Sequence, residues 1–237
     1  MAESDFAGRG TTPLALTIPG LNNSGPDHWQ SIWERTRGDC DRVDLGMWGS
    51  PRRNVWVTKL DHAIKQAPAP VILVAHSLGC LAVAWWAALE GQPYGWPVAG
   101  ALLVAPPDCD RNDACQAVGG FGPVPKVSLP FPSVVVASRD DPYATLDRSH
   151  SMAKFWGSHF VDAGTLGHIN AESDVGAWLF GQRLLDRLIA SANERARMPP
   201  GDRSSAGPWS LYPPAGVPAP ETERRAPMSA VQPPPSC

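Results

Sequence analysis

Short apolar runs alternate along the chain with longer segments in which apolar residues recur every three or four positions. The short runs are rich in β-branched residues and predict buried strands, whereas the longer segments predict helices with one face against a core. We expect strands over Leu14–Ile18, Arg42–Leu45, Val71–Val74, Ala99–Ala105, Ser133–Ser138 and His159–Asp162, and helices over Asp27–Arg37, Val55–Gln66, Leu78–Leu89, Thr145–Trp156 and Glu172–Arg195. Strands and helices that take turns in this way predict an α/β fold, with a mainly parallel, doubly wound sheet of about six strands.

The alternating pattern ends near Met198. From Met198 to Cys237 the sequence holds 11 of its 26 prolines and few large apolar residues. Such a segment buries too little surface to offset its ordering entropy, and its prolines interrupt helices and strand pairing. We therefore predict one domain over residues 1–197 and a Pro-rich, disordered tail over 198–237, with a polyproline docking peptide as the alternative for the tail. The segment Pro106–Pro132 is also rich in proline and glycine and predicts an excursion from the sheet rather than a helix.

Composition and charge narrow the range of partners. The formal net charge is −3 and the pI is near 6.0, which does not favour binding to nucleic acid or to an anionic membrane. No apolar run is long enough to cross a bilayer, and the acidic start of the chain does not resemble a signal peptide. The five cysteines form no C-x-x-C pair, so we expect no disulfide framework, no metal site and a reducing, cytoplasmic location. The ten tryptophans are expected to fill the core.

One turn carries the strongest chemical signal. The apolar run at 71–74 leads into Ala75-His76-Ser77-Leu78-Gly79, and a helical run rich in Leu and Ala follows at once. This is the strand–turn–helix context of a G-x-S-x-G nucleophile elbow, with Ala75 in place of the first glycine. Such a turn holds the serine hydroxyl at a helix N-terminus, where backbone N–H groups favour developing negative charge. Ser77 is therefore the candidate nucleophile, and a helix-capping serine is the simpler alternative.

A serine nucleophile needs a base and an acid, which in this type of fold follow later strands in the order Ser, Asp, His. The expected strand at 133–138 leads into Asp140-Asp141-Pro142, and the last expected strand leads into Gly167-His168. His168 is the candidate base. Asp141 is the preferred acid because it directly precedes proline, and Asp140 is the alternative, which otherwise would satisfy loop amides or pair with Arg139.

Other histidines and the oxyanion site complete the predicted site. His76 is expected to point away from Ser77 and pack locally, and His28 is expected either to touch substrate or to cap the first helix. Hydrolysis passes through an oxyanion that needs two preorganised N–H donors, for which we predict the backbone amides of Leu78 and Leu21. Pro19-Gly20-Leu21 lacks the G-x-x-G spacing of a dinucleotide site, and no phosphate-binding loop is present, so no cofactor is expected.

These motifs resemble those of the small serine hydrolases related to retinoblastoma-binding protein 9. The resemblance runs from about Leu14 to Ile189 and is carried by four segments: residues 19–30, 75–79, 140–143 and 167–170. It implies an α/β-hydrolase core without a large lid and a catalytic triad at Ser77, Asp141 and His168. The leucine-x-cysteine-x-glutamate peptide of the family's animal member is absent, so pocket-protein binding is not implied.

Together these features predict a serine hydrolase that acts through an acyl-enzyme on a small ester, thioester or amide. The alternative is a non-enzymatic module that keeps the hydrolase fold and binds a ligand or a protein.

Overall fold

The computed structural model describes residues 12–90, 92–114 and 117–198. The predicted tail lies outside the described residues apart from Met198. Six strands are formed by β1 (Leu14–Ile18), β2 (Cys40–Arg42), β3 (Val71–His76), β4 (Val98–Val104), β5 (Ser133–Ala137) and β6 (His159–Asp162). Five α-helices are formed by α1 (Trp29–Thr36), α2 (Arg53–Gln66), α3 (Leu78–Leu89), α4 (Leu146–Trp156) and α5 (Leu179–Arg197).

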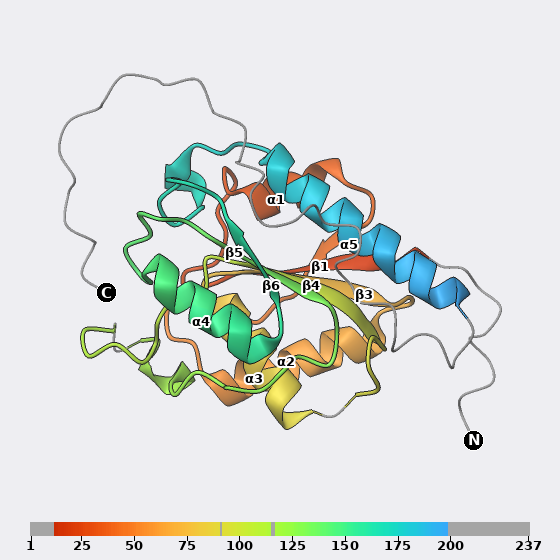
Figure 1. Ribbon diagram of the computed structural model, residues 1–237, viewed down its shortest axis with the longest axis horizontal. Coiled ribbons are helices and arrows are strands. Elements are labelled where there is room, and N and C mark those ends of the chain that lie inside the picture. The colour runs from red at the N-terminus through yellow and green to blue at the C-terminus, as the bar shows by residue number, and fades with distance from the viewer. Residues whose placement is uncertain (1–11, 91, 115–116, 199–237) are drawn as a thin grey trace.

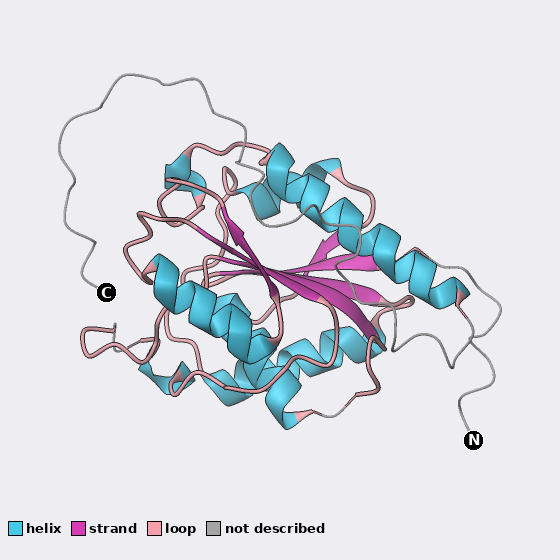
Figure 2. Ribbon diagram, in the orientation of Figure 1, coloured by secondary structure: helices cyan, strands magenta, loops and turns pink. Residues whose placement is uncertain are grey.

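The described strands form one parallel sheet in the order β2-β1-β3-β4-β5-β6 (Figure 2). The central strands β3 and β4 are buried along their whole length. Strands covered on both faces have no solvent side, and this explains why their sequences are continuous apolar runs rather than alternating ones. The predicted fold class is confirmed, and the sheet is entirely parallel.

Two helical layers cover the sheet. Helices α1 and α5 lie on one face, and α2, α3 and α4 lie on the other (Figure 1). Successive side chains of a strand point to opposite faces, so Leu73 of β3 belongs to the same core cluster as Trp56 of α2. Its neighbour Ile72 belongs to the opposite cluster, with Trp29 of α1. The sheet therefore has a separate hydrophobic core on each of its two faces.

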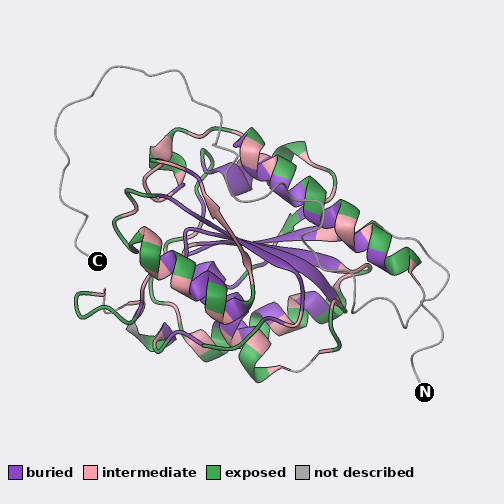
Figure 3. Cartoon of the chain, in the orientation of Figure 1, coloured by how far each residue is buried: buried purple, intermediate pink, exposed green. Residues whose placement is uncertain are grey.

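The central strands are buried between the two helical layers (Figure 3). Four tryptophans are among the largest fully buried side chains, which agrees with the expectation that Trp fills the core. Trp29 and Trp33 of α1 pack with Trp178 against one face of the sheet. Trp56 and Trp156 pack on the other face.

Two predicted elements differ from the structure by more than two residues at one end. The second strand covers Cys40–Arg42 instead of Arg42–Leu45, because residue pairing with β1 ends at Arg42. Val43 and Leu45 are buried instead by packing in the core that contains Trp56 of α2. The last helix begins at Leu179 instead of Glu172. Left-handed backbone at Asp174, Gly176 and Trp178, with φ of 50°, 53° and 42°, stops a continuous helix before that point.

The segment between β4 and β5 contains one described turn of 3-10 helix, Gly119–Phe121. Trp85 of α3 donates to the carbonyl of Phe121, and Trp156 of α4 donates to the carbonyl of Pro125. These bonds fasten the excursion to the α3 and α4 layer. Within the described ranges, no helix is both long and apolar enough to cross a membrane.

Candidate active site

The predicted site residues come from four loops at one edge of the sheet. Ser77 follows β3, Asp141 follows β5, His168 follows β6, and Leu21 follows β1. The carboxyl ends of parallel strands all lie at the same edge, and this is where ligands bind in open α/β sheets. The topology therefore brings together residues that are up to 147 positions apart, from Leu21 to His168.

Ser77 occupies a strained turn between β3 and α3. Its φ of 52° and ψ of −126° lie in a region that non-glycine residues rarely adopt, at a cost of about 1–3 kcal/mol. The backbone is held there by the bond from Ser77 N to Val104 O (2.9 Å) and by the bond from Cys80 N to Ser77 O (2.9 Å). The side chain stays half-buried at the N-terminus of α3.

Close packing under the turn explains its small residues. A Cβ on Gly79 would lie 2.2 Å from the carbonyl oxygen of Ile18, which is a backbone atom in β1. A Cβ on Gly20 would lie 2.8 Å from the Cβ of Ser77. Ala75, which stands where the motif has its first glycine, is not among the positive-φ residues, so an alanine fits there without strain.

We predict that Gly79→Ala destabilises the protein by about 2–3 kcal/mol, the upper part of the usual range for overpacking, because the backbone atoms that the new Cβ meets cannot move away. This corresponds to roughly 4–12 °C in melting temperature for a domain of this size. The control is Gly38→Ala, because no atom lies within 4 Å of a Cβ added at Gly38. Equal melting temperatures for the two variants, measured by circular dichroism, would contradict the prediction.

A chain of hydrogen bonds connects the three predicted side chains. The Nδ1 atom of His168 lies 2.9 Å and 3.0 Å from the two carboxylate oxygens of Asp141. A carboxylate only accepts, so Nδ1 carries the ring proton and Nε2 is left as an acceptor. The Oγ of Ser77 lies 2.8 Å from this Nε2 and donates to it. Such an arrangement allows an imidazole to remove a proton from a hydroxyl while a carboxylate stabilises the imidazolium.

The structure separates the two neighbouring aspartates. Asp141 faces His168, and its carboxylate also accepts from the backbone N–H of Tyr143 (2.9 Å). Asp140 instead accepts from the hydroxyl of Ser138 (2.6 Å) and from the backbone N–H of Gly167 (2.8 Å). Asp140 thus ties the loop that carries His168 to the end of β5, and Arg139 pairs with Asp162 rather than with Asp140.

Two aromatic rings hold the imidazole of His168. Tyr143 packs edge-on against it with 4.5 Å between ring centroids, and the ring of His76 lies 4.9 Å away. His76 does more than the local packing expected of it, because its Nε2 donates to the carbonyl of His168 (2.9 Å). The sequence did not predict a role for Tyr143, since its only signal was an aromatic residue shortly after the aspartate. It also did not predict the hydrogen bond of His76, since its only signal was a histidine inside the elbow.

His28 and His76 form a buried pair beside His168, with ring centroids 4.6 Å apart. His28 caps α1, since its Nδ1 accepts from the N–H of Gln30. Burial above all, and then the nearby His168 and Arg42, lower the pKa of His28 to about 3. Burial also lowers the pKa of His76 well below its ordinary value. Both rings are therefore neutral at pH 7 and do not compete with His168 for a proton.

The two predicted oxyanion donors, the backbone amides of Leu78 and Leu21, lie next to the turn at Ser77. Leu78 is the first residue of α3, where a helix leaves its N–H without an intrahelical acceptor. Leu21 follows Gly20, whose Cβ position is 3.1 Å from the nitrogen of Leu78. Among the described residues, neither amide donates a hydrogen bond in a turn or to a side chain.

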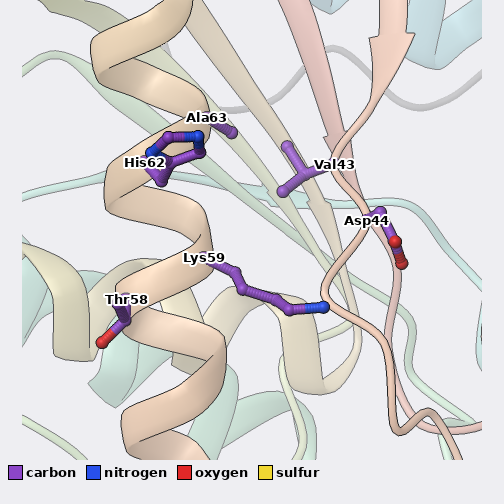
Figure 4. Close-up of a pocket in the computed structure, with 6 residues that line it drawn as sticks. All are labelled: Val43, Asp44, Thr58, Lys59, His62 and Ala63. Atoms are coloured by element: carbon purple, nitrogen blue, oxygen red, sulfur yellow. The ribbon is translucent and has the colours of Figure 1, made fainter.

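A pocket of about 450 Å³ lies apart from these residues, between α2 and the segment after β2. Its walls include Asp44, Lys59 and His62, and Lys59 extends from α2 toward that segment (Figure 4). The pocket shares no residue with the Ser77 site. Within the described part of the chain, no group of three His, Cys, Asp or Glu side chains is placed to hold a metal ion, and Cys40, Cys80 and Cys109 are free thiols.

Solved structures share this architecture. A protein described as a YdeN-like hydrolase from Pectobacterium atrosepticum SCRI1043 is 31% identical, with a TM-score of 0.67 over 76% of this chain and 92% of its own. The ydeN gene product of B. subtilis is 19% identical, with a TM-score of 0.62 over 76% of this chain and 100% of its own. Est1E from Butyrivibrio proteoclasticus is 16% identical, with a TM-score of 0.55 over 77% and 90%.

No curated protein matches the sequence. The family model described as serine hydrolase matches residues 15–187, which span the six strands apart from Leu14 and end within the first half of α5. This range agrees with the span of the resemblance seen in the sequence. The chain thus belongs to the serine hydrolase family, as a small α/β-hydrolase similar to the YdeN-like hydrolases.

Proposed function

We propose that the protein hydrolyses a small ester, thioester or amide through an acyl-enzyme, with Ser77 as nucleophile, His168 as base and Asp141 as the acid that orients it. The observation that carries the proposal is the hydrogen-bonded chain from Ser77 through His168 to Asp141, placed at a strained turn before a helix. An ordinary helix-capping serine does not require that strain, and the side chain of Ser77 makes no cap bond in α3.

In the first half of the reaction, the Oγ of Ser77 attacks the carbonyl carbon while its proton passes to the Nε2 of His168. The tetrahedral oxyanion accepts from the backbone N–H groups of Leu78 and Leu21. The carbon–leaving group bond then breaks, and the leaving group takes the proton from His168. In the second half a water molecule attacks the acyl carbon while its proton passes to Nε2 of His168. The bond from that carbon to the Oγ of Ser77 then breaks, the Oγ takes the proton back from His168, and the acid is released.

The acyl group is proposed to be short. Ser77 is only half-buried, and Tyr143, whose ring packs against His168, is 39% exposed as a residue, which favours a shallow site over an enclosed tunnel. The initial rates for p-nitrophenyl esters of increasing chain length measure this preference. We expect kcat/KM to be highest for acetate to butyrate and to fall for longer chains.

Labelling by a fluorophosphonate tests the proposed reaction directly. We expect the native protein to take up one equivalent of probe, measured by intact-protein mass spectrometry, because a serine attacks phosphorus quickly only where a base removes its proton. Ser77→Ala is expected to take up none, and peptide mapping should place the label on Ser77. Native protein that stays unlabelled and cleaves none of the esters would instead favour a binding module on a hydrolase scaffold.

A further inference from the structure

The turn that carries His168, residues Gly167–Asn170, has a costly backbone conformation. Gly167 has a φ of 54°, and Ile169 has a φ of 48°. The left-handed region is unfavourable for any side chain and most of all for a β-branched one. Ile169 is also fully buried. Such a turn persists only where its surroundings hold it, so its contacts determine where His168 lies.

Two side chains from distant elements bind consecutive carbonyl groups of this turn. The Nε2–H of His76 donates to the carbonyl of His168 (2.9 Å), and the indole N–H of Trp29 donates to the carbonyl of Ile169 (2.8 Å). Both donors are buried, Trp29 completely. The rings of Trp29 and His76 also meet edge to face, with centroids 6.0 Å apart.

His76 directly precedes Ser77. The same short segment therefore presents the nucleophile and, through the imidazole of His76, binds the turn that carries the base. We propose that His76 and Trp29 are positioning residues that set the separation of His168 Nε2 and Ser77 Oγ by holding these two carbonyls. This proposal rests on the proposed function, in which His168 is the base.

The neighbours of His76 keep it suited to this task. A carbonyl only accepts, so His76 must carry its proton on Nε2. The titratable and charged groups facing it are His28 and His168, and burial holds the pKa values of both His28 and His76 below their ordinary range. A neutral His76 donates one hydrogen bond without placing a positive charge beside the imidazolium that forms at His168.

Helix α1 supplies a matched pair of variants. Trp33 is as completely buried as Trp29, and its indole N–H also donates to a backbone carbonyl, that of Ala177 (2.7 Å), away from the turn of the base. Trp29→Phe and Trp33→Phe therefore each delete one indole hydrogen bond of a fully buried tryptophan from the same helix. We expect similar losses in melting temperature from the two changes.

Only Trp29→Phe is expected to affect turnover. A displacement of about 1 Å in the base lowers the rate by up to 10²-fold, so we expect kcat for p-nitrophenyl acetate to fall about 10-fold or more, with KM within about twofold. Trp33→Phe is expected to keep kcat within about twofold of the native value. Equal kcat for the two variants would overturn the proposal for Trp29, since a purely structural role affects both alike.

The role of His76 is tested by two substitutions, which separate its N–H donor from its aromatic ring. His76→Gln keeps an N–H donor at a similar reach, whereas His76→Phe keeps a ring and removes the donor. We expect kcat to fall least for Gln and about 10-fold further for Phe. A kcat that is equal in the two variants would overturn the role of the hydrogen bond. Should His76→Phe not fold, the Trp29 and Trp33 pair decides the proposal.

A readout independent of turnover separates this proposal from the proposed function. The Nδ1 proton of His168 gives a downfield NMR signal when bound to Asp141, and it is assigned by its loss in His168→Ala. We expect the signal to broaden or shift in Trp29→Phe and to persist in Trp33→Phe. A native protein with this signal but no hydrolysis or labelling refutes the proposed function alone. An unchanged signal in Trp29→Phe refutes the positioning role of Trp29 alone.

Discussion

Ser77→Ala and His168→Ala are each expected to lower kcat for a p-nitrophenyl ester by a factor on the order of 10⁶, with the double variant scarcely slower than either. The reason is that a serine hydroxyl attacks a carbonyl only while a base removes its proton, so the two groups act as one unit. The 2.8 Å contact between Ser77 Oγ and His168 Nε2 is the physical basis of that unit.

The fold should survive both changes. The Oγ of Ser77 makes its described hydrogen bond to His168, and the backbone N–H and C=O of Ser77, which hold the turn, remain. Circular dichroism should therefore give melting temperatures within a few degrees of the native value. Ser151→Ala is the matched control, since Ser151 is half-buried on α4, as Ser77 is at its turn, and within the described residues its hydroxyl bonds only the carbonyl of Asp147. Losses that multiply in the double variant would contradict the assignment.

Asp141→Asn is expected to lower kcat by about 10⁴-fold, whereas Asp140→Asn should cost less than about tenfold. Asparagine at 141 keeps the shape but removes the charge that stabilises the imidazolium. Its amide N–H₂ can also face Nδ1, which reverses the hydrogen bond and leaves Nε2 protonated toward Ser77. Asp140 makes its two bonds as an acceptor from Ser138 and Gly167, and an asparagine carbonyl oxygen can accept both.

Rates at neutral and alkaline pH distinguish the two effects. Hydroxide partly replaces a weakened base, so the activity of Asp141→Asn should recover in part as the pH rises, relative to the native enzyme. Asp140→Asn should show no such recovery. A larger loss for Asp140→Asn would show that the aspartate facing His168 is not the one on which turnover depends.

The local pattern was sufficient to predict the fold class and the approximate place of each candidate residue. Strands buried on both faces must be apolar throughout, so β3, β4 and β5 are visible as continuous runs. The elbow around Ser77 is likewise visible as a local motif, because its serine and its small residues lie within a few positions of one another, although the contact that requires glycine at 79 is with Ile18 of β1. Chain order then pointed to an aspartate after β5 and to His168 after β6.

Element ends were predicted less well where packing and not pairing buries the residues. Val43 and Leu45 have the apolar alternation of a strand, yet they pack in the core beyond the end of β2. The apolar positions before Leu179 belong to a turn with three left-handed residues, which a helical period cannot reveal. A pattern records burial, and burial alone does not distinguish a paired strand from a packed loop.

The sequence by itself therefore determined the α/β order, the turn at Ser77 and the set of residues from which a site is built. Only the tertiary structure decided that Asp141 and not Asp140 faces His168, because the two side chains diverge at the end of a strand. It alone also joined His76 and Trp29 to the turn of His168, across 92 and 140 positions of the chain. Hydrogen bonds of that span depend on how two layers of helices pack on one sheet, and no local period or motif encodes them.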